Sequence, residues 1–267
     1  MLNSWRWQRK RSSSAYKKGG KVQFLICGTQ KGGTTALADY LRKHPELFLP
    51  KQKELHFFDD ENQDWAATNY EHYESCFCDA PSAAICGEAT PIYMYWDPSP
   101  ARIWNYNPAM KLIVLLRNPI SRAYAHWAME TRRGQETLPF EDALIQEEAR
   151  CRKTLPQQHR VFSYQDRGFY SQQIRRLWHF FGREAVLVIR QEALRADPMG
   201  TLNHICQHLG VKPMPEVEPL QSHSGQYKEP LSKEALIQLK KHFRWEILAL
   251  QDLLEWDCQN WLEGELT

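Results

Sequence analysis

The chain has 267 residues, of which 42% are hydrophobic and 25% charged, and its formal net charge is +2 at pH 7. That length and apolar content suit one large α/β domain with its own core. The small net charge argues against a nucleic-acid-binding protein, and no apolar run approaches the roughly 18 residues of a membrane helix.

Residues 1–21 differ in composition from the rest, because they are basic, rich in serine and free of acidic residues. They lack the apolar stretch of a secretory signal. We interpret them as a flexible tail before a domain at residues 22–267. An organelle transit peptide shares this composition and stays open as an alternative.

The seven cysteines are odd in number and irregular in spacing, which favours reduced thiols and a cytoplasmic location. His72 with Cys76, Cys78 and Cys86 fits no usual zinc pattern, so no metal site is predicted.

Strands and helices alternate along the domain. Short apolar runs predict strands at residues 22–27, 84–87, 111–117 and 185–190. Helical periodicity and capping signals predict helices at residues 34–43, 64–77, 119–132, 140–150, 168–181, from 198 onward, and 231–254. Irregular connectors are expected at residues 46–60 (with a short strand), 151–166 and 211–230. This order predicts one doubly wound, P-loop-like α/β domain, with a mainly parallel sheet and helices on both faces.

A glycine turn joins the first strand to the first helix in residues 24–35, FLICGTQKGGTT. A helix N-terminus offers free backbone N–H groups and the positive end of a dipole, and glycines let the backbone close on an anion. The loop is therefore expected to bind a phosphate or sulfate group. Its candidate ligand-binding residues are Lys31, Gly32, Gly33, Thr34 and Thr35.

The loop departs from the G-x-x-x-x-G-K-[ST] pattern, because Thr34 stands where nucleotide hydrolases have their lysine. The Lys-Ser/Thr pair that serves phosphates and Mg²⁺ is absent. The later strands end in Arg117 and Arg190 instead of an aspartate. An arginine at the carboxyl edge of a parallel sheet suits a second phosphate. The expected ligand carries two separated anionic groups and needs no metal.

Several segments, in order, resemble sulfotransferases that use 3′-phosphoadenosine 5′-phosphosulfate (PAPS). The glycine loop resembles their 5′-phosphosulfate loop, and LLRNPISRAYAHW resembles their 3′-phosphate segment. KELHFFD resembles the segment after the loop in the heparan-sulfate type. The resemblance runs from residue 22 to about 255. It implies a PAPS-dependent sulfotransferase domain, which we take to be of the soluble bacterial, small-molecule kind.

The resemblance also implies roles for particular residues. Lys31 would stabilise the departing phosphate, the backbone of residues 32–35 would cradle the 5′-phosphate, and Arg117 would grip the 3′-phosphate. Glu54 matches the family's catalytic base, and the LHFF run beside it is expected to desolvate it. His56 is the rival base because its ordinary pKa suits the task. Both stay open.

The late loop SHSGQYKEP is expected to bring Tyr227 and Lys228 to PAPS. Two positions depart from the family pattern. Ala125 replaces a serine that helps to hold the 3′-phosphate, with Ser121 or Arg122 as candidate replacements. Ala89 stands where the heparan-sulfate enzymes have a lysine near the acceptor.

The acceptor is expected to be a small metabolite or natural product, sulfated on a hydroxyl or a nitrogen, and natural-product tailoring fits such a role. An oligosaccharide acceptor is the alternative. A P-loop small-molecule kinase and a non-catalytic nucleotide-binding module remain as competing hypotheses. Glu88, His126 and His223 are weaker candidates. An aromatic run is expected to line an acceptor pocket or to pack in the core, and it comprises Tyr93, Tyr95, Trp96, Trp104 and Tyr106.

Overall fold

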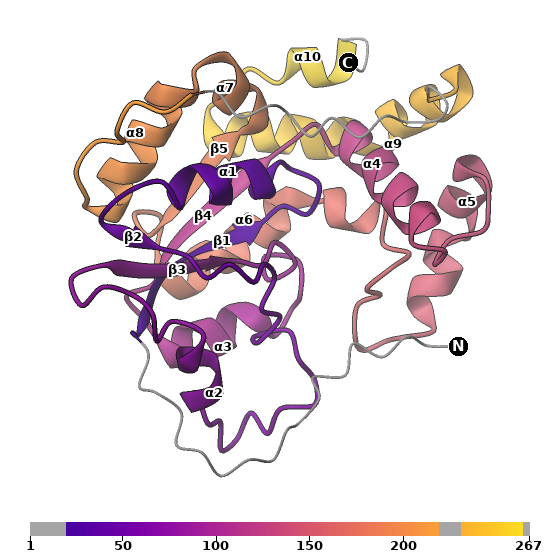
Figure 1. Ribbon diagram of the computed structural model, residues 1–267. Helices are drawn as coiled ribbons and strands as arrows, with labels where there is room; N and C mark the ends of the chain where they lie inside the picture. Colours follow the sequence, from indigo (N-terminus) through magenta and orange to yellow (C-terminus); the bar gives the residue numbers. More distant parts are fainter. Residues whose placement is uncertain (1–19, 219–230, 264–267) are drawn as a thin grey trace.

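The computed structural model describes residues 20–218 and 231–263. Its sheet has five parallel strands in the order β2-β3-β1-β4-β5 (Figure 1). The strands are β1 (Val22–Gly28), β2 (Leu47–Phe48), β3 (Ile85–Ala89), β4 (Lys111–Leu116) and β5 (Val186–Arg190). The predicted parallel α/β sheet is therefore confirmed, and the carboxyl ends of its strands share one edge.

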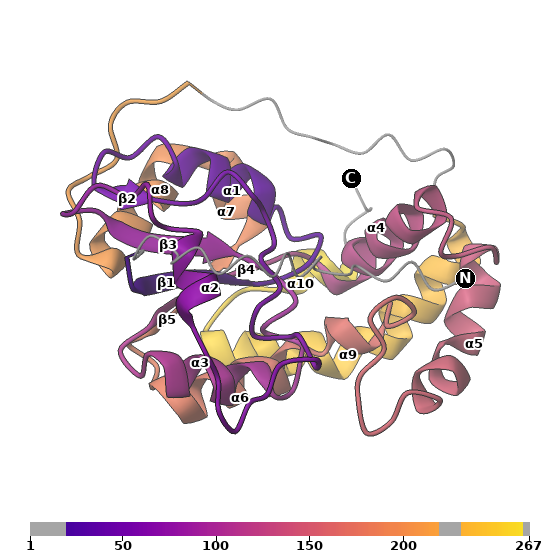
Figure 2. The ribbon, with the colours of Figure 1, turned by 60° about the horizontal axis from the view of Figure 1, so that its bottom comes forward.

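The helices cover both faces of this sheet (Figure 2), as predicted. They are α1 (Thr34–Leu41), α2 (Glu71–Ser75), α3 (Ser99–Tyr106), α4 (Pro119–Arg132), α5 (Phe140–Arg152), α6 (Tyr170–Phe181), α7 (Gln191–Ala196), α8 (Pro198–Leu209), α9 (Lys233–Leu254) and α10 (Gln259–Glu263), with a 3₁₀ turn η1 (Asp166–Gly168). Within the described residues, no helix is both long and apolar enough to span a membrane.

The core has two halves, one on each face of the sheet. Phe24 and Ile26 of β1 pack with α1, α7 and α8, whereas Leu25 and Cys27 pack toward α3, α6 and α9. Successive side chains of a strand point to opposite faces. The continuous apolar runs seen in the sequence therefore supply both halves at once.

The helix expected at residues 64–77 is wrong over its first half, since α2 begins only at Glu71. Side chains there accept hydrogen bonds from nearby backbone N–H groups. The Ala66 N–H donates to Asp64 Oδ1 at 3.1 Å, and the Glu71 N–H donates to Asn69 Oδ1 at 2.8 Å. Such local bonds compete with helix formation. The short helices α3, α7 and α10 were not predicted as separate elements.

Candidate active site

The loop between β1 and α1, residues 28–33, lies at the carboxyl edge of the sheet. A Cβ on Gly32 would lie 2.4 Å from the Leu115 carbonyl oxygen of β4, so only glycine fits. Gly33 has a φ of 100° and caps α1 without a side-chain hydrogen bond. The loop thus approaches β4 closely, and no side chain of its cap residue occupies the first N–H groups of α1, an arrangement that suits an anion.

Positive charge gathers around this loop. Burial, together with the nearby charges of Arg132, Arg117, Arg133 and Lys53, lowers the pKa of Lys31 to about 8. Within the described residues, no carboxylate pairs with Lys31, Arg117 or Arg132. Cations held together without counter-charges suit an anionic ligand.

Arg117 follows β4 directly and lies beside the loop, as expected. Its Nη1 donates to the Lys31 carbonyl oxygen at 3.4 Å, and its Nε donates to Ser121 Oγ at 3.0 Å. Ser121 therefore orients Arg117. Arg122 is fully buried and donates to the Tyr164 carbonyl oxygen, so it does not replace the serine missing at Ala125.

The segment after the loop, residues 53–59, forms the second part of the site. The Glu54 N–H donates to the carbonyl oxygen of Ala89 at 3.2 Å, which ties the segment to the end of β3. Glu54 and His56 have φ values of 56° and 52°, a conformation that costs energy for residues other than glycine. This backbone turns both side chains into one ion pair, with His56 Nε2 3.5 Å from Glu54 Oε2.

Asp59 completes this group from a fully buried position. His56 Nδ1 lies 3.0 Å from Asp59 Oδ2, so the imidazole bridges two carboxylates. Burial lowers the pKa of His56, but hydrogen bonds to Asp59 and Glu54 outweigh it and raise that pKa to about 9. Burial raises the pKa of Glu54, yet His56 and Lys53 bring it below its ordinary value. At neutral pH the pair is therefore an imidazolium and a carboxylate.

Lys53 joins the two parts of the site. Its Nζ donates to Thr35 Oγ1 at the start of α1, and it lies 3.6 Å from Glu54 Oε1. One ammonium group therefore contacts both the start of α1 and the base candidate Glu54.

Lys53, Asp59 and Arg160 were missed by sequence reasoning. Asp59 ends the KELHFFD motif, three residues after His56, and that spacing was a usable signal. Arg160 pairs with Asp59 from more than a hundred residues away, and no local pattern marks it.

Two weaker candidates, Glu88 and His126, are buried in the protein interior. Glu88 is fully buried and accepts hydrogen bonds from Tyr73, Tyr93 and Thr90. Burial lowers the pKa of His126 well below its ordinary range. Of the aromatic run, Trp104 is exposed and the other four are buried, so the core-packing interpretation holds.

Arg190, the other arginine at the end of a strand, has different surroundings. Arg190 donates to the Asp257 carbonyl oxygen and Cys258 Sγ, so it anchors the segment before α10. Tyr227, Lys228 and His223 lie outside the described residues. The residues that the structure describes contain no group of three or more His, Cys, Asp or Glu suited to a metal ion.

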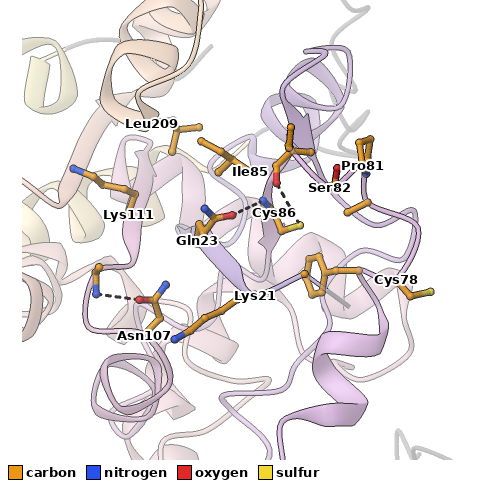
Figure 3. A pocket seen from close by; sticks show the side chains of 16 residues that line it. Lys21, Gln23, Cys78, Pro81, Ser82, Ile85, Cys86, Asn107, Lys111 and Leu209 are labelled. Carbon is orange, nitrogen blue, oxygen red and sulfur yellow. Dashed lines mark hydrogen bonds between the residues drawn. The ribbon is translucent and has the colours of Figure 1, made fainter. Parts of the chain in front are cut away.

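A hollow of about 900 Å³ opens at the opposite edge of the sheet (Figure 3). It is lined by the amino ends of the strands, including Gln23 of β1, Cys86 of β3 and Lys111 of β4. Ligands of parallel α/β sheets bind at the carboxyl ends of the strands. The charge cluster at Lys31 therefore marks the site better than this hollow does.

Comparison with known proteins finds sulfotransferases. The chain is 32% identical over 193 residues to heparan sulfate glucosamine 3-O-sulfotransferase 6 of Mus musculus, a match that covers 71% of this chain and 52% of that protein. It is 33% identical over 134 residues to the membrane-associated sulfotransferase kil1 of Dictyostelium discoideum, covering 47% of this chain and 28% of that protein. The chain thus spans about half the length of the heparan sulfate relatives.

A solved structure of a sulfotransferase from Alicyclobacillus acidocaldarius matches the fold with a TM-score of 0.77 at 27% identity, covering 91% of this chain and 99% of that one. The family model described as the sulfotransferase domain matches residues 21–241. With most of its length matched in this way, the chain belongs to the sulfotransferase family.

Proposed function

We propose that this protein transfers the sulfuryl group of PAPS to a hydroxyl or nitrogen of an acceptor. The observation that carries the proposal is the contact of Lys53 with both Thr35 and Glu54. It places an ionised carboxylate beside a loop whose cations lack carboxylate partners. A proton acceptor next to an anion-binding loop is what in-line sulfuryl transfer requires.

The donor would occupy the loop and the adjacent arginine. The backbone N–H groups at residues 32–35 and the Lys31 ammonium suit the phosphosulfate. Arg117, oriented by Ser121, suits the 3′-phosphate. Tyr227 and Lys228 remain candidates for donor contacts from the late loop.

Glu54 is the preferred base over His56. The pKa of His56 is raised to about 9, so at neutral pH its imidazole already carries the proton that a base would have to accept. Glu54 is ionised, and its ion pair with His56 orients the carboxylate. The positive φ values at both residues support a site in which backbone strain is kept for a functional geometry.

The reaction balances with these groups. The acceptor oxygen or nitrogen attacks the sulfur as Glu54 takes its proton, and the bond between the sulfur and the phosphate oxygen breaks. The electron pair of that bond goes to the phosphate oxygen, where the Lys31 charge stabilises it. No step requires a metal ion.

A small metabolite or natural product is our first candidate for the acceptor. A saccharide hydroxyl is the second, and the match to relatives named heparan sulfate glucosamine 3-O-sulfotransferases favours it. Ala89, in place of a lysine, supports the first candidate because it removes a cation that an acidic saccharide would meet.

The test uses the full chain with sulfur-labelled PAPS and EDTA, offered a metabolite extract or desulfated heparan oligosaccharides. Labelled product in either arm supports the proposal and identifies the acceptor class. A parallel arm contains labelled ATP and Mg²⁺. Transfer from ATP alone, or tight binding of 3′-phosphoadenosine 5′-phosphate (PAP) with no product from any acceptor, would overturn it.

A further inference from the structure

The segment between α5 and η1, residues 153–165, brings an arginine to the base relay of Glu54, His56 and Asp59. The Arg160 guanidinium pairs with Asp59 Oδ2 and also donates to the Asp59 carbonyl oxygen. Its flat face lies 4.2 Å from the centre of the Trp96 ring. The Asp59 side chain has no exposed surface, whereas 42% of the Arg160 side chain is exposed. Two polar contacts and a stacking partner hold the guanidinium in one orientation.

A second arginine attaches the same segment to the donor loop. Arg167 of η1 is buried and donates to the Arg160 carbonyl oxygen at 2.6 Å and to Ser163 Oγ at 2.8 Å. It also donates to Gln30 Oε1 of the donor loop at 2.5 Å. The backbone at Arg160 is therefore braced against the loop that carries Lys31.

We propose that Arg160 is a positioning residue for sulfuryl transfer, which fixes Asp59 and through it the His56–Glu54 pair, and that Arg167 braces this relay against the donor loop. The inference rests on the proposed role of Glu54 as base. Arg160 acts on Glu54 indirectly, through two other residues. Asp59 contacts Nδ1 of the His56 ring, and Nε2 of that ring contacts Glu54.

The positive charge of Arg160 lowers the pKa of Asp59. Burial raises the pKa of Asp59, and the contacts of His56 together with the charge of Arg160 outweigh it, so the net pKa lies below its ordinary value. Without Arg160 the pKa of Asp59 must rise, because one of the two cations paired with it in the described part of the chain is lost. The other titratable groups facing the relay are Lys53 and Arg133 near Glu54, Glu88 near His56, Tyr93 near Asp59 and Glu61 near Arg160.

The test compares Arg160→Gln and Arg160→Lys with a matched control, Arg183→Gln. Arg183 also lies over a tryptophan ring, 4.3 Å from the centre of that of Trp178, but it stands between α6 and the amino end of β5, at the edge of the sheet opposite the relay. Each full-length variant, labelled with ¹³C at the aspartate carboxyl carbons, is titrated by NMR. PAP binding is measured by calorimetry. We expect the pKa of Asp59 to rise by about 1–3 units in Arg160→Gln, less in Arg160→Lys, and not in Arg183→Gln.

Activity supplies the second readout. In Arg160→Gln the acid limb of the pH profile moves to higher pH and kcat falls about tenfold, part of the roughly 10²–10⁴ that a positioned base contributes. PAP affinity stays unchanged. The inference would be overturned if the pKa of Asp59 did not shift in either Arg160 variant, or if PAP affinity fell by as much as kcat. If Arg160→Gln does not fold, the titration of Arg160→Lys decides. Failure of the wild type to transfer sulfur would sink the proposed function alone, since the titration needs no acceptor.

Discussion

Glu54 and Glu88 are both attached to the end of β3, since Glu88 is a residue of that strand and the backbone N–H of Glu54 donates to Ala89. The surroundings of their carboxyl groups differ. Glu88 is enclosed by three hydroxyl groups, and burial raises its pKa. Glu54 is paired with His56 and Lys53, which bring its pKa below the ordinary value although burial acts against them. Burial alone therefore does not set the protonation state of a carboxyl group, because the charge of its hydrogen-bonding partners can outweigh burial.

The largest effect is expected when each of the two carboxylates is replaced by an amide. Glu54→Gln should lower kcat by about 10²–10⁴-fold because the proton acceptor is lost. PAP affinity should be retained. Glu88→Gln should keep most of the activity, as measured by transfer from labelled PAPS. Equal losses in the two variants would mean that their surroundings do not distinguish the roles.

The next largest effect is expected at the cation beside the leaving group. Lys31→Ala should reduce kcat by about 10²–10³-fold, the usual range for removing one group that stabilises developing charge. Single-turnover kinetics at saturating PAPS measures it. Lys21→Ala, at the amino end of β1, is the matched control and should behave like the wild type. If Lys31→Ala raised only KM, the residue would bind the donor without helping the reaction.

Arg117 is expected to bind the donor and to take no part in activating the acceptor. Arg117→Ala should raise the Kd for PAP by roughly tenfold to a hundredfold, since charge-assisted hydrogen bonds contribute about 1.5–3 kcal/mol. Ser121→Ala should have a smaller effect of the same kind, because Ser121 only orients the guanidinium. Calorimetry with PAP checks both. A drop in kcat with unchanged PAP affinity would contradict the assignment.

The pH dependence tests the charge around the loop. Burial and neighbouring cations lower the pKa of Lys31 to about 8, so in the free protein it loses its charge as the pH rises through that value. We expect kcat/KM for PAPS to fall above pH 8 by about tenfold per unit. In Lys31→Arg the decline should start at higher pH, because a guanidinium keeps its charge. A profile that stays flat to pH 10 would contradict this.

The smallest effect concerns Glu88. Its raised pKa means that the folded state disfavours the charged form, so its contribution to stability is full below the unfolded pKa, near the ordinary value of 4.5, and is lost as the pH rises through the folded pKa. Glu88→Gln removes this loss. The Tm of the variant, relative to that of the wild type, should therefore rise from pH 4 to pH 7. A constant difference across that range would show that the carboxyl has the same pKa in the folded and unfolded states.

Much of the candidate anion site could be predicted from local sequence. The strand–glycine–helix order placed the loop at the carboxyl edge, and Arg117 followed the clearest apolar run to the same edge. The base relay was predicted only in part, because the KELHFFD motif marked Glu54 and His56 but not Asp59 or Arg160. Arg160 and Asp59 are 101 positions apart, and such pairs leave no periodic pattern.

Local sequence was enough to predict the parallel sheet, the glycine loop and the two base candidates, because apolar runs, glycine positions and motif spacing act over a few residues. The proposed preference for Glu54 over His56 rests on the tertiary arrangement. Asp59 and Glu54 lie on either side of one imidazole and favour its protonated form, which is why we propose Glu54 as the proton acceptor. That choice depends on distances between charges, which no count of residues along the chain contains.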